Sequence, residues 1–382
     1  MLAEDIASEN MKVFRHLSSF VGDVWHPSVG SAGAYEWWYF DAISNDGRDA
    51  LVIIFLADFI FSPRFNRAVA DYLRGGCDAP RPAQFPALSV CVYRDGRLSF
   101  RANNEYTSND FTASVDEPAC RIARSSFHAA SSSQGHSYDV KLDEPLRGGR
   151  RLTAELRWTV TDGDLLPAQE PTDISEPMTE HDAPWHEWNL VAPRCRVSGM
   201  VMVKGEGGET LNERRFDGVG YHDHNQDRRW MPATVAEWQW GRAHFDNETT
   251  AVFYRYREQG NEAATTRLFL IRDEMLGEHD AHMTASEMRA HHFGLRYPRT
   301  MRFTVEGADA PLSLSVTQRR VIEGSYFYLR FLGEATLDTG DGQTQSALAI
   351  TEHLSPRTLR WRWLDWLTSM RIGRRGRTSF LP

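Results

Sequence analysis

The stretch RLTAELRWTV (Arg151–Val160) decides the fold class of this chain. Its apolar residues fall at alternate positions, namely Leu152, Ala154, Leu156, Trp158 and Val160. Alternate residues of a β-strand point to the same face of a sheet, so this pattern predicts a strand with one buried face. The stretch is followed by Asp162-Gly163, a dipeptide that is typical of tight turns.

Stretches rich in β-branched and aromatic residues recur along the chain and predict further strands. They are Trp37–Ala42, Leu51–Phe55, Ala87–Tyr93, Arg196–Val203, Ala251–Tyr256, Thr266–Arg272, Met301–Val305, Leu312–Thr317 and Ser325–Leu332. Turn residues such as Asp95-Gly96 bound many of them. Short strands with regular turns favour antiparallel sandwiches or barrels over alternating βαβ units. The sequence therefore predicts a mainly β protein.

Helical patterns are few. We expect helices at Arg64–Gly75, Ala285–His292 and Leu359–Met370. In the last of these, the apolar side chains fall on one face, which predicts an amphipathic helix near the C-terminal end of the chain. The Pro- and acid-rich stretch Leu165–Pro184 predicts an irregular excursion, either a disordered loop or a lid over a pocket.

Chain length and charge bound the number of domains and the class of partner. With 382 residues the chain exceeds one ordinary core, and we expect two domains, residues 1–229 and 230–382. The formal net charge of -9 argues against nucleic-acid binding, which favours basic surfaces. No GxGxxG motif opens a predicted helix and there is no P-loop, so nucleotide binding has no support in the sequence.

Cysteine usage and hydropathy bear on the compartment. The four cysteines include no CxxC pair, which fits neither a zinc site nor a disulfide framework and is typical of a reducing compartment. Glu4, Asp5 and Glu9 near the start of the chain argue against a secretory signal. The longest apolar stretch, Leu51–Phe61, is interrupted by Asp58 and falls short of the ~20 residues that a membrane-spanning helix needs. We expect a cytoplasmic protein that is soluble or lies at a membrane surface.

The motif GYHDHN, which ends at Asn225, is the most informative feature for function. In a strand, Tyr221, Asp223 and Asn225 share one face. His222 and His224 then share the other face. A carboxyl beside a phenol and imidazoles suits proton transfer to a carbon–carbon double bond.

Two other interpretations of this motif remain open. His222 and His224 have the His-x-His spacing of some metal ligands, and His186 could join them, although further ligands lack a source. Asp223 and Asn225 could instead cap a turn and bond to the backbone. We favour the interpretation in which none of these residues binds a metal.

The motif His186-Glu187-Trp188 offers a second group for the same chemistry. If it is a strand, His186 and Trp188 face the same side. The face of the indole would then stabilise a cation, and the imidazole would orient water or shuttle a proton. The two residues could also be a packed surface pair, and spacing alone does not choose between these roles.

Aromatic residues are densest in EWWYFD, residues 36–41. Trp37 and Tyr39 point one way, while Trp38 and Phe40 point the other. Core packing is the usual fate of such a strand, but a barrel strand can pack on one face and line a cavity with the other. The stretch WQW, residues 238–240, repeats the alternation. The residues expected to bind an apolar, polyene-like or terpenoid substrate are Trp37, Trp38, Tyr39, Trp238, Trp240 and Asn225.

Four motifs, in this order along the chain, resemble the carotenoid 1,2-hydratase (hydroxyneurosporene synthase) family. They are AYEWWYFDA (Ala34–Ala42), Phe61-Ser62-Pro63, His186-x-Trp188 and Gly220-Tyr221-x-Asp223. The similarity extends over roughly residues 30–370.

This resemblance implies two lipocalin-like antiparallel β-barrel domains packed together, with the active site near their junction. It implies addition of water, without a cofactor, to a terminal trisubstituted alkene of an acyclic carotenoid. By the same resemblance, Asp223 matches the proton-donating carboxyl, and Tyr221, His186 and Trp188 match its supporting residues. Related lipocalin-like proteins act as isomerases, cyclases or pericyclic catalysts on other hydrophobic molecules.

The chemistry itself sets three requirements. Protonating an alkene at neutral pH needs an acid kept protonated by burial, the tertiary cation needs π-faces, and a polar group must hold the water. Without water, the same cation loses a proton or cyclises. The leading hypothesis is therefore a hydratase, a hydro-lyase of carotenoid biosynthesis. The alternatives are a terpenoid cyclase or isomerase, and a non-catalytic protein that binds a hydrophobic ligand.

Residues 357–377 (RTLRWRWLDWLTSMRIGRRGR) combine many arginines with clustered tryptophans, and Asp365 is their only acid. Such a segment could lie in a membrane interface with its arginines on anionic headgroups, so that the enzyme extracts a substrate dissolved in the bilayer. Alternatively, the segment packs its tryptophans against the second domain. Both interpretations remain open from the sequence.

Overall fold

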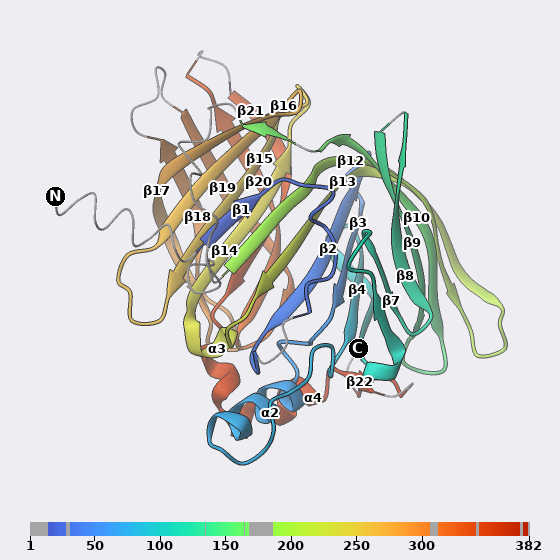
Figure 1. Cartoon of the computed structure of the whole chain (residues 1–382). Helices are drawn as coiled ribbons and strands as arrows, with labels where there is room; N and C mark the ends of the chain where they lie inside the picture. Colours follow the sequence, from blue (N-terminus) through green and yellow to red (C-terminus); the bar gives the residue numbers. More distant parts are fainter. Residues whose placement is uncertain are drawn as a thin grey trace. The chain divides into compact units, whose positions relative to one another are not determined.

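The structure is a computed structural model of the chain. It describes residues 14–27, 31–133, 135–163, 165–167, 186–305, 312–340, 344–374 and 377–380. The chain divides into two compact units (Figure 1). The first unit comprises Met1–Asp164, Glu176–Met231 and Leu359–Pro382, and the second comprises Leu165–Ser175 and Pro232–Thr358. The C-terminal segment thus groups with the first unit, in contrast to a single division after residue 229.

The first unit is built on one curled sheet. Its strands are β1 (Phe14–Leu17), β2 (Tyr35–Ser44), β3 (Asp49–Leu56), β4 (Ala87–Arg94), β5 (Arg97–Glu105), β6 (Phe111–Ala113), β7 (Ala119–Ile122), β8 (Ser125–Ser132), β9 (Gly135–Pro145), β10 (Arg151–Asp162), β12 (His186–Lys204), β13 (Thr210–Asp227) and β22 (Gly373–Arg374). Their order is β22-β5-β4-β3-β2-β13-β12-β10-β9-β8-β7-β6, with β1 beside β12. Figure 1 shows β2, β13 and β12 side by side in the middle of this order.

Strand β10 shows how the sequence pattern builds the core of this unit. Its even-numbered residues from Leu152 to Trp158 are buried in one hydrophobic cluster. Trp38 and Phe40 of β2 belong to the same cluster. Burying a large apolar side chain contributes about 1.5–3 kcal/mol, so alternation at this density stabilises the curled sheet. We call the face of the sheet that carries Trp38 and Phe40 the core face.

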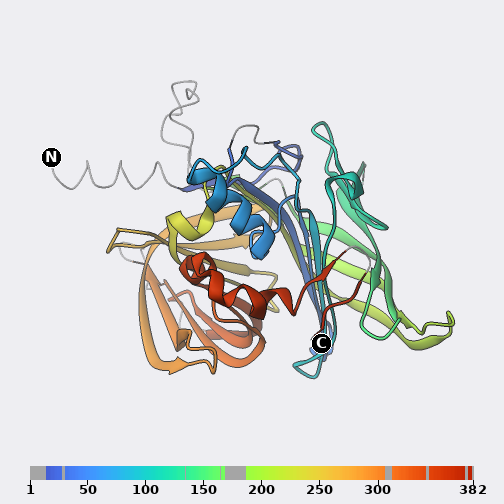
Figure 2. The same cartoon turned by 90° about the horizontal axis from the view of Figure 1, so that it is seen from below.

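Helix α2 (Pro63–Leu73) confirms the helix expected at Arg64–Gly75. It begins where its sequence signals place it, because the Ser62 side chain caps the backbone N–H of Arg64 and a proline occupies the first turn. The short helix α4 (Asp365–Ser369) lies beside α2, as Figure 2 shows. The Arg67 Nε atom is 2.5 Å from Asp365 Oδ2 and ties the two helices together.

The single helix expected at Leu359–Met370 is wrong in extent. The segment forms two 3₁₀ turns, Pro356–Arg360 and Arg362–Leu364, followed by α4. The extended backbone of Trp361 (φ -90°, ψ 97°) separates the two 3₁₀ turns. As a result, the tryptophans do not form the buried face, and their exposed fractions are 46% for Trp361, 69% for Trp363 and 58% for Trp366.

The second unit is a closed barrel. Its strands are β11 (Leu166–Pro167), β14 (Val235–His244), β15 (Thr250–Glu258), β16 (Thr265–Arg272), β17 (Met275–Ala290), β18 (Arg296–Val305), β19 (Leu312–Gly324), β20 (Tyr328–Asp338) and β21 (Thr344–Leu354). Strands β14 to β21 pair in sequence order, and β21 pairs back to β14, so the ring closes (Figure 2). The short helix α3 (Met231–Thr234) precedes β14.

The helix expected at Ala285–His292 is wrong. Residues 275–290 form the long strand β17, which pairs with both β16 and β18. Ala285 lies opposite Met301, and Met288 lies opposite Pro298. The ladder hydrogen bonds of residues 285–290 with β18 outweigh the weak helix preference of this short stretch.

The fold-class prediction is confirmed: the described residues form mainly β structure with few helices, in two antiparallel β units. The second unit is a closed barrel, whereas the sheet of the first curls into a half-barrel. Most of the excursion expected at Leu165–Pro184, residues 168–184, lies outside the described residues. In the described part of the chain, no helix is both long and apolar enough to cross a membrane.

Candidate active site

Strand β13 carries the GYHDHN motif between two partners. Across the ladder with β2, Asp223 lies opposite Tyr39 and Asn225 lies opposite Trp37. Across the ladder with β12, Asn225 lies opposite Trp188. Residues that face each other in a ladder share one side of the sheet. These residues therefore gather on one face, opposite the core face, which we call the Asp223 face.

The Asp223 carboxyl lies at the centre of this face and is buried. The Tyr221 hydroxyl donates to Asp223 Oδ2 at 2.6 Å, and the Trp188 indole N–H donates to the same oxygen at 2.8 Å. The Asn225 amide donates to Asp223 Oδ1 at 2.9 Å. The structure therefore brings four of the predicted site residues into one hydrogen-bonded cluster.

Aromatic rings border this carboxyl cluster. The Tyr39 ring meets the Tyr221 ring edge to face, with centroids 6.1 Å apart, and the Tyr39 hydroxyl donates to Asp41 Oδ2 at 3.0 Å. The Trp37 ring stacks on Tyr35 at 5.1 Å. Two of the predicted substrate-binding aromatics, Trp37 and Tyr39, thus lie on the Asp223 face.

One polar atom of the cluster has no partner. Among the described residues, Asn225 Oδ1 is a buried acceptor without a hydrogen bond, while the Asn225 amide nitrogen holds Asp223. Buried acceptors are usually satisfied by protein or by water. A carbonyl oxygen fixed beside a carboxyl can accept from a water molecule or from a polar group of a ligand.

His186 lies further along the same face, beside residues that the sequence did not single out. Its Nδ1 atom is 3.4 Å from the Tyr35 hydroxyl and 3.8 Å from Asp227 Oδ2. Burial, together with the positive charge of Arg229, lowers the pKa of His186 from its ordinary value of 6.5 to about 3. The imidazole is therefore neutral at neutral pH and can hold a proton only transiently.

The histidines of the motif lie on the core face. His222 Nε2 is 2.9 Å from Asp23 Oδ2, and His222 Nδ1 is 2.9 Å from the backbone oxygen of Tyr39. His224 Nε2 is 2.8 Å from Glu36 Oε1, and His224 Nδ1 is 3.3 Å from Asp23 Oδ1. The alternation of side chains along β13 thus produces two separate polar clusters.

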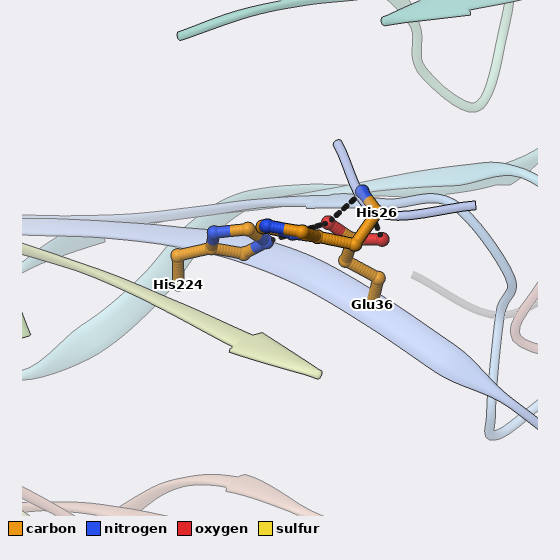
Figure 3. Close-up of side chains that lie close together, drawn as sticks. All are labelled: His26, Glu36 and His224. Carbon is orange, nitrogen blue, oxygen red and sulfur yellow. Dashed lines mark hydrogen bonds and ion pairs between the residues drawn. The ribbon is translucent and has the colours of Figure 1, made fainter. Parts of the chain in front are cut away.

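Charge pairing perturbs the second cluster. Burial alone would raise the pKa of Glu36, but hydrogen bonds from His224 and His26 lower it below its ordinary value of 4.5. Burial alone would lower the pKa of His224, but the hydrogen bond to Glu36 and the charges of Glu36 and Asp23 raise it above 6.5. The two groups form a buried ion pair, and His26 approaches the same carboxylate (Figure 3).

The geometry assembles neither the ligand set nor the turn cap that the two alternative interpretations of the motif expect. His222 and His224 lie on the core face while His186 lies on the Asp223 face, so the three imidazoles form no ligand set. Asp223 and Asn225 lie inside β13 and bond to side chains, so they do not cap a turn.

The remaining predicted aromatics lie apart from this cluster. Trp38 is on the core face, where its ring stacks on His224 at 4.8 Å. Trp238 and Trp240 belong to β14 of the second unit, and Trp238 contacts Tyr254 at 5.2 Å. On β14, the alternate face that includes Ala243 enters the interior core of the barrel. The two tryptophans therefore lie on the outer side of that barrel.

Sequence reasoning gave no role to Asp23, Glu36, His26 or Asp227. Glu36 did carry a signal, because a carboxylate within an aromatic strand must be paired if it is buried. Asp23 and His26 carried none, since they lie on an irregular segment that reaches β13 only through the folded structure.

The geometry defines a class of protein: a mainly β chain with a buried carboxyl fixed among aromatic rings. Two solved structures share its fold. A putative AttH from Nitrosomonas europaea aligns with a TM-score of 0.58 and 14% identity, covering 89% of this chain and 97% of that chain. CghA with Sch210972 aligns with a TM-score of 0.57 and 13% identity, with the same coverage of both chains.

Sequence comparison identifies the family. The family described as "Carotenoid hydratase CrtC" matches residues 116–381, and the chain belongs to it. The chain is 24% identical over 371 residues to a protein named hydroxyneurosporene dehydrogenase from Chlorobaculum tepidum, covering 93% of this chain and 91% of that protein. It is 28% identical over 253 residues to an acyclic carotenoid 1,2-hydratase from Rubrivivax gelatinosus, covering 62% of this chain and 52% of that protein.

The resemblance noted in the motifs is confirmed by this membership. The chain is an enzyme of the carotenoid hydratase family, and this membership places it among the hydro-lyases that hydrate a carbon–carbon double bond of a carotenoid. The substrate is accordingly a hydrophobic small molecule.

Proposed function

We propose that Asp223 is the proton donor of this hydration and that Tyr221, Trp188 and Asn225 hold it in place. The observation that carries the proposal is the convergence of three side-chain donors on one buried carboxyl. The indole and the amide donate to the two carboxyl oxygens and fix the plane of the group. The Tyr221 hydroxyl can both donate and accept, so the pair accommodates Asp223 with or without its proton.

The reaction then proceeds in two steps. Asp223 gives its proton to one alkene carbon, which forms a C–H bond and leaves a tertiary cation on the neighbouring carbon. A water molecule adds to that cation, and its surplus proton returns to the Asp223 carboxylate. The sum is the addition of one water molecule, with no oxidation or reduction. A cation at this point is stabilised by aromatic faces, which Trp37 and Tyr39 supply on the same face of the sheet.

Asn225 Oδ1 is the group we assign to the water. No described residue forms a hydrogen bond to this buried acceptor, and its own amide nitrogen is bound to the acid. A water molecule held there lies beside the carboxyl that must take back its proton, and such fixed orientation can lower the barrier substantially. His186, neutral and next to Asp227, would support the far end of the same face.

Isotopically labelled water tests this proposal. The purified chain is incubated with an acyclic carotenoid in H₂¹⁸O or D₂O, and the products are analysed by mass spectrometry. We expect an alcohol that carries one ¹⁸O atom in the first solvent and one carbon-bound deuterium in the second. Deuterium without ¹⁸O would mean an isomerase or cyclase, and an unchanged carotenoid would mean a binding protein. Asp223→Asn should form neither labelled product while still binding the carotenoid.

We also propose that the enzyme meets a lipid bilayer through its C-terminal segment. Trp361, Trp363 and Trp366 are exposed, and the first two rings stack with centroids 6.1 Å apart. The neighbouring Arg360 and Arg362 are exposed as well. Indole rings suit the interfacial region of a bilayer, and arginines suit anionic headgroups. A carotenoid substrate resides in such a bilayer, so peripheral contact would shorten its path into the enzyme.

A further inference from the structure

We propose that His26, Glu36 and His224 form a binding site for one divalent metal ion of the zinc type (Figure 3). The three residues come from the segment before β2, from β2 and from β13. Each offers one ligand atom, and the three atoms lie within 4.8 Å of one another. None of them belongs to the Asp223 cluster, so the site is independent of the proposed hydration chemistry.

The spacing of the ligand atoms suits a metal ion. Glu36 Oε1 is 2.8 Å from His224 Nε2 and 3.3 Å from His26 Nδ1. In a tetrahedral zinc site with bonds of about 2.0–2.2 Å, neighbouring ligand atoms are separated by about 3.3–3.6 Å. Small ring rotations of the two histidines would open the present contacts to that spacing. Figure 3 shows the two imidazoles meeting at the Glu36 carboxylate.

Two of the three ligands are already oriented. The backbone N–H of His26 donates to both carboxylate oxygens of Glu36, at 3.0 and 3.1 Å. Asp23 Oδ1 lies 3.3 Å from His224 Nδ1, the ring nitrogen that faces away from Glu36. A histidine that binds a metal almost always gives its other N–H to a carboxylate, which fixes its tautomer.

Asp23 is itself held rigidly, as such an orienting group must be. Its Oδ2 atom accepts from the Tyr138 hydroxyl at 2.6 Å and lies 2.9 Å from His222 Nε2. The approach of Oδ1 to His224 is an ion pair without hydrogen-bond alignment, so that oxygen accepts no hydrogen bond from the part of the chain that the structure describes. Rotation of the His224 ring toward a metal would align this contact.

One of the three ligands, His26, is accessible from solvent, while Glu36 and His224 are buried. A small pocket with a cavity volume of about 20 Å³ is lined by residues that include Trp25, His26, Glu36 and Asp58. A volume of this size holds about one water molecule. The side chain of His26 is 38% exposed, so an ion can enter from this side. Water in the pocket would then complete the coordination that three protein ligands leave open.

The expected consequence is stabilisation. An ion that binds only the folded chain stabilises it in proportion to RT ln(1 + [ion]/Kd). Here the ion would tie the segment before β2 to the two central strands β2 and β13. The Asp223 carboxyl lies on the opposite face of β13, so loss of the ion should leave proton transfer intact at temperatures where the protein stays folded.

Direct metal titration tests the site. The full-length chain is freed of metal by dialysis against a chelator, and Zn²⁺ is then titrated by calorimetry. Co²⁺ serves as a spectroscopic probe, because its visible absorption reports the ligand geometry. We expect one Zn²⁺ ion per chain, a tetrahedral Co²⁺ spectrum and a Zn²⁺-dependent rise in Tm.

Matched variants locate the ion. His26→Ala, at a half-exposed position where the fold should tolerate the change, should weaken Zn²⁺ binding by at least tenfold and abolish the rise in Tm. Glu36→Gln should do the same where it folds. His128→Ala, an exposed histidine beside Asp139, is the control and should bind Zn²⁺ as the wild type does. Absence of binding, or binding that survives in His26→Ala, would overturn the proposal. Hydration activity is assayed separately, so a failed hydratase assay would not be mistaken for a failed metal site.

Discussion

Asp223 and His224 are consecutive residues of β13, yet their side chains enter two separate clusters on opposite faces of the strand. The Asp223 carboxyl accepts from Trp188 on one face, whereas His224 lies 2.8 Å from Glu36 on the other. The ladder with β2 is continuous from Gly218 to Asp227, so no bulge disturbs this alternation. A substitution in one cluster should therefore leave the hydrogen bonds of the other cluster unchanged.

Asp223→Asn should abolish catalysis while preserving the fold. A positioned proton donor typically contributes ~10²–10⁴ in rate, so we expect turnover to fall by at least about 10². The new amide would leave one of the surrounding donors unsatisfied, which costs about 1–3 kcal/mol of unfolding free energy. Turnover and chemical denaturation, measured on the same preparation, check both values.

Glu144→Gln is the matched control for this change. Glu144 is also a fully buried carboxyl with three side-chain donors, from Asn104, Tyr106 and Ser125, each at 2.7 Å. It lies on β9, outside the Asp223 face. Its replacement should lower stability by a similar amount and leave turnover per folded molecule unchanged. An equal loss of turnover in both variants would mean that Asp223 acts only through the fold.

Tyr221→Phe and Tyr39→Phe should separate the two tyrosines of the Asp223 face. Tyr221 bonds to the acid itself at 2.6 Å, whereas Tyr39 bonds to Asp41. A hydrogen bond to a charged group contributes about 1.5–3 kcal/mol, which corresponds to a loss of roughly 10–100-fold in turnover for Tyr221→Phe. Tyr39→Phe keeps the aromatic ring, and its turnover should fall less than that of Tyr221→Phe. Steady-state kinetics decide the order, and a larger loss for Tyr39→Phe would contradict the assignment of roles.

Much of this site could be predicted from the sequence, because period-two alternation assigns faces without knowledge of the fold. Alternation places Tyr221, Asp223 and Asn225 together and separates them from the two histidines. It also predicts that Trp37 and Trp38 diverge. It does not say which face meets the core, and for this reason Trp38 was expected at the substrate although it packs on His224.

Long-range pairing could not be predicted. Asp23 and His26 reach β13 from almost 200 residues away, and Asp227 meets His186 only through the register of β12 with β13. The helix prediction at residues 285–292 was wrong for a related reason. A short segment without strong periodicity adopts the structure of the strand with which it pairs, here β18. The prediction of one helix at Leu359–Met370 was wrong because 3₁₀ turns and one extended residue change which side chains share a face.

His186 should make the protein sensitive to mild acid. The pKa of His186 is about 3 in the folded state and 6.5 ordinarily. At a pH between these two values, His186 is therefore protonated in the unfolded chain but not in the folded chain. Stability present above pH 6.5 is therefore lost as the pH falls toward 3, and this group alone should remove about 2 kcal/mol by pH 5. His186→Gln should lose less stability than the wild type between pH 7 and pH 5, as measured by urea unfolding. Equal losses of stability in the two proteins over this range would contradict the assignment to His186.

Gly220→Ala should destabilise the fold next to the acid. A Cβ atom there would lie 2.5 Å from the backbone oxygen of Asp41 and 2.7 Å from the Trp158 indole nitrogen, so the strands would have to separate. Overpacking of this kind costs about 1–3 kcal/mol. Gly207→Ala is the control, because its Cβ would meet only the flexible end of Glu209. Denaturation midpoints for the two variants should differ clearly, and equal midpoints would contradict the tight packing at Gly220.

The exposed tryptophans should mediate binding to anionic bilayers. We expect the full-length chain to sediment with vesicles of phosphatidylglycerol and phosphatidylcholine at low salt, and to be released partly at high salt because the arginine contribution is screened. The double substitution Trp363→Ala and Trp366→Ala removes two exposed indoles. It should reduce the bound fraction severalfold without lowering Tm, since neither ring is buried.

Leu211→Ala is the control for these tryptophans, because it removes an exposed apolar side chain of the same unit from strand β13. It should sediment as the wild type does.

The consequence for catalysis follows from where the substrate resides. Carotenoid delivered in anionic vesicles should be converted more slowly by the double variant, whereas carotenoid delivered in detergent micelles should be converted at the wild-type rate. Equal loss with both deliveries would place the tryptophans in the reaction itself, and no loss with vesicles would remove the membrane from the mechanism.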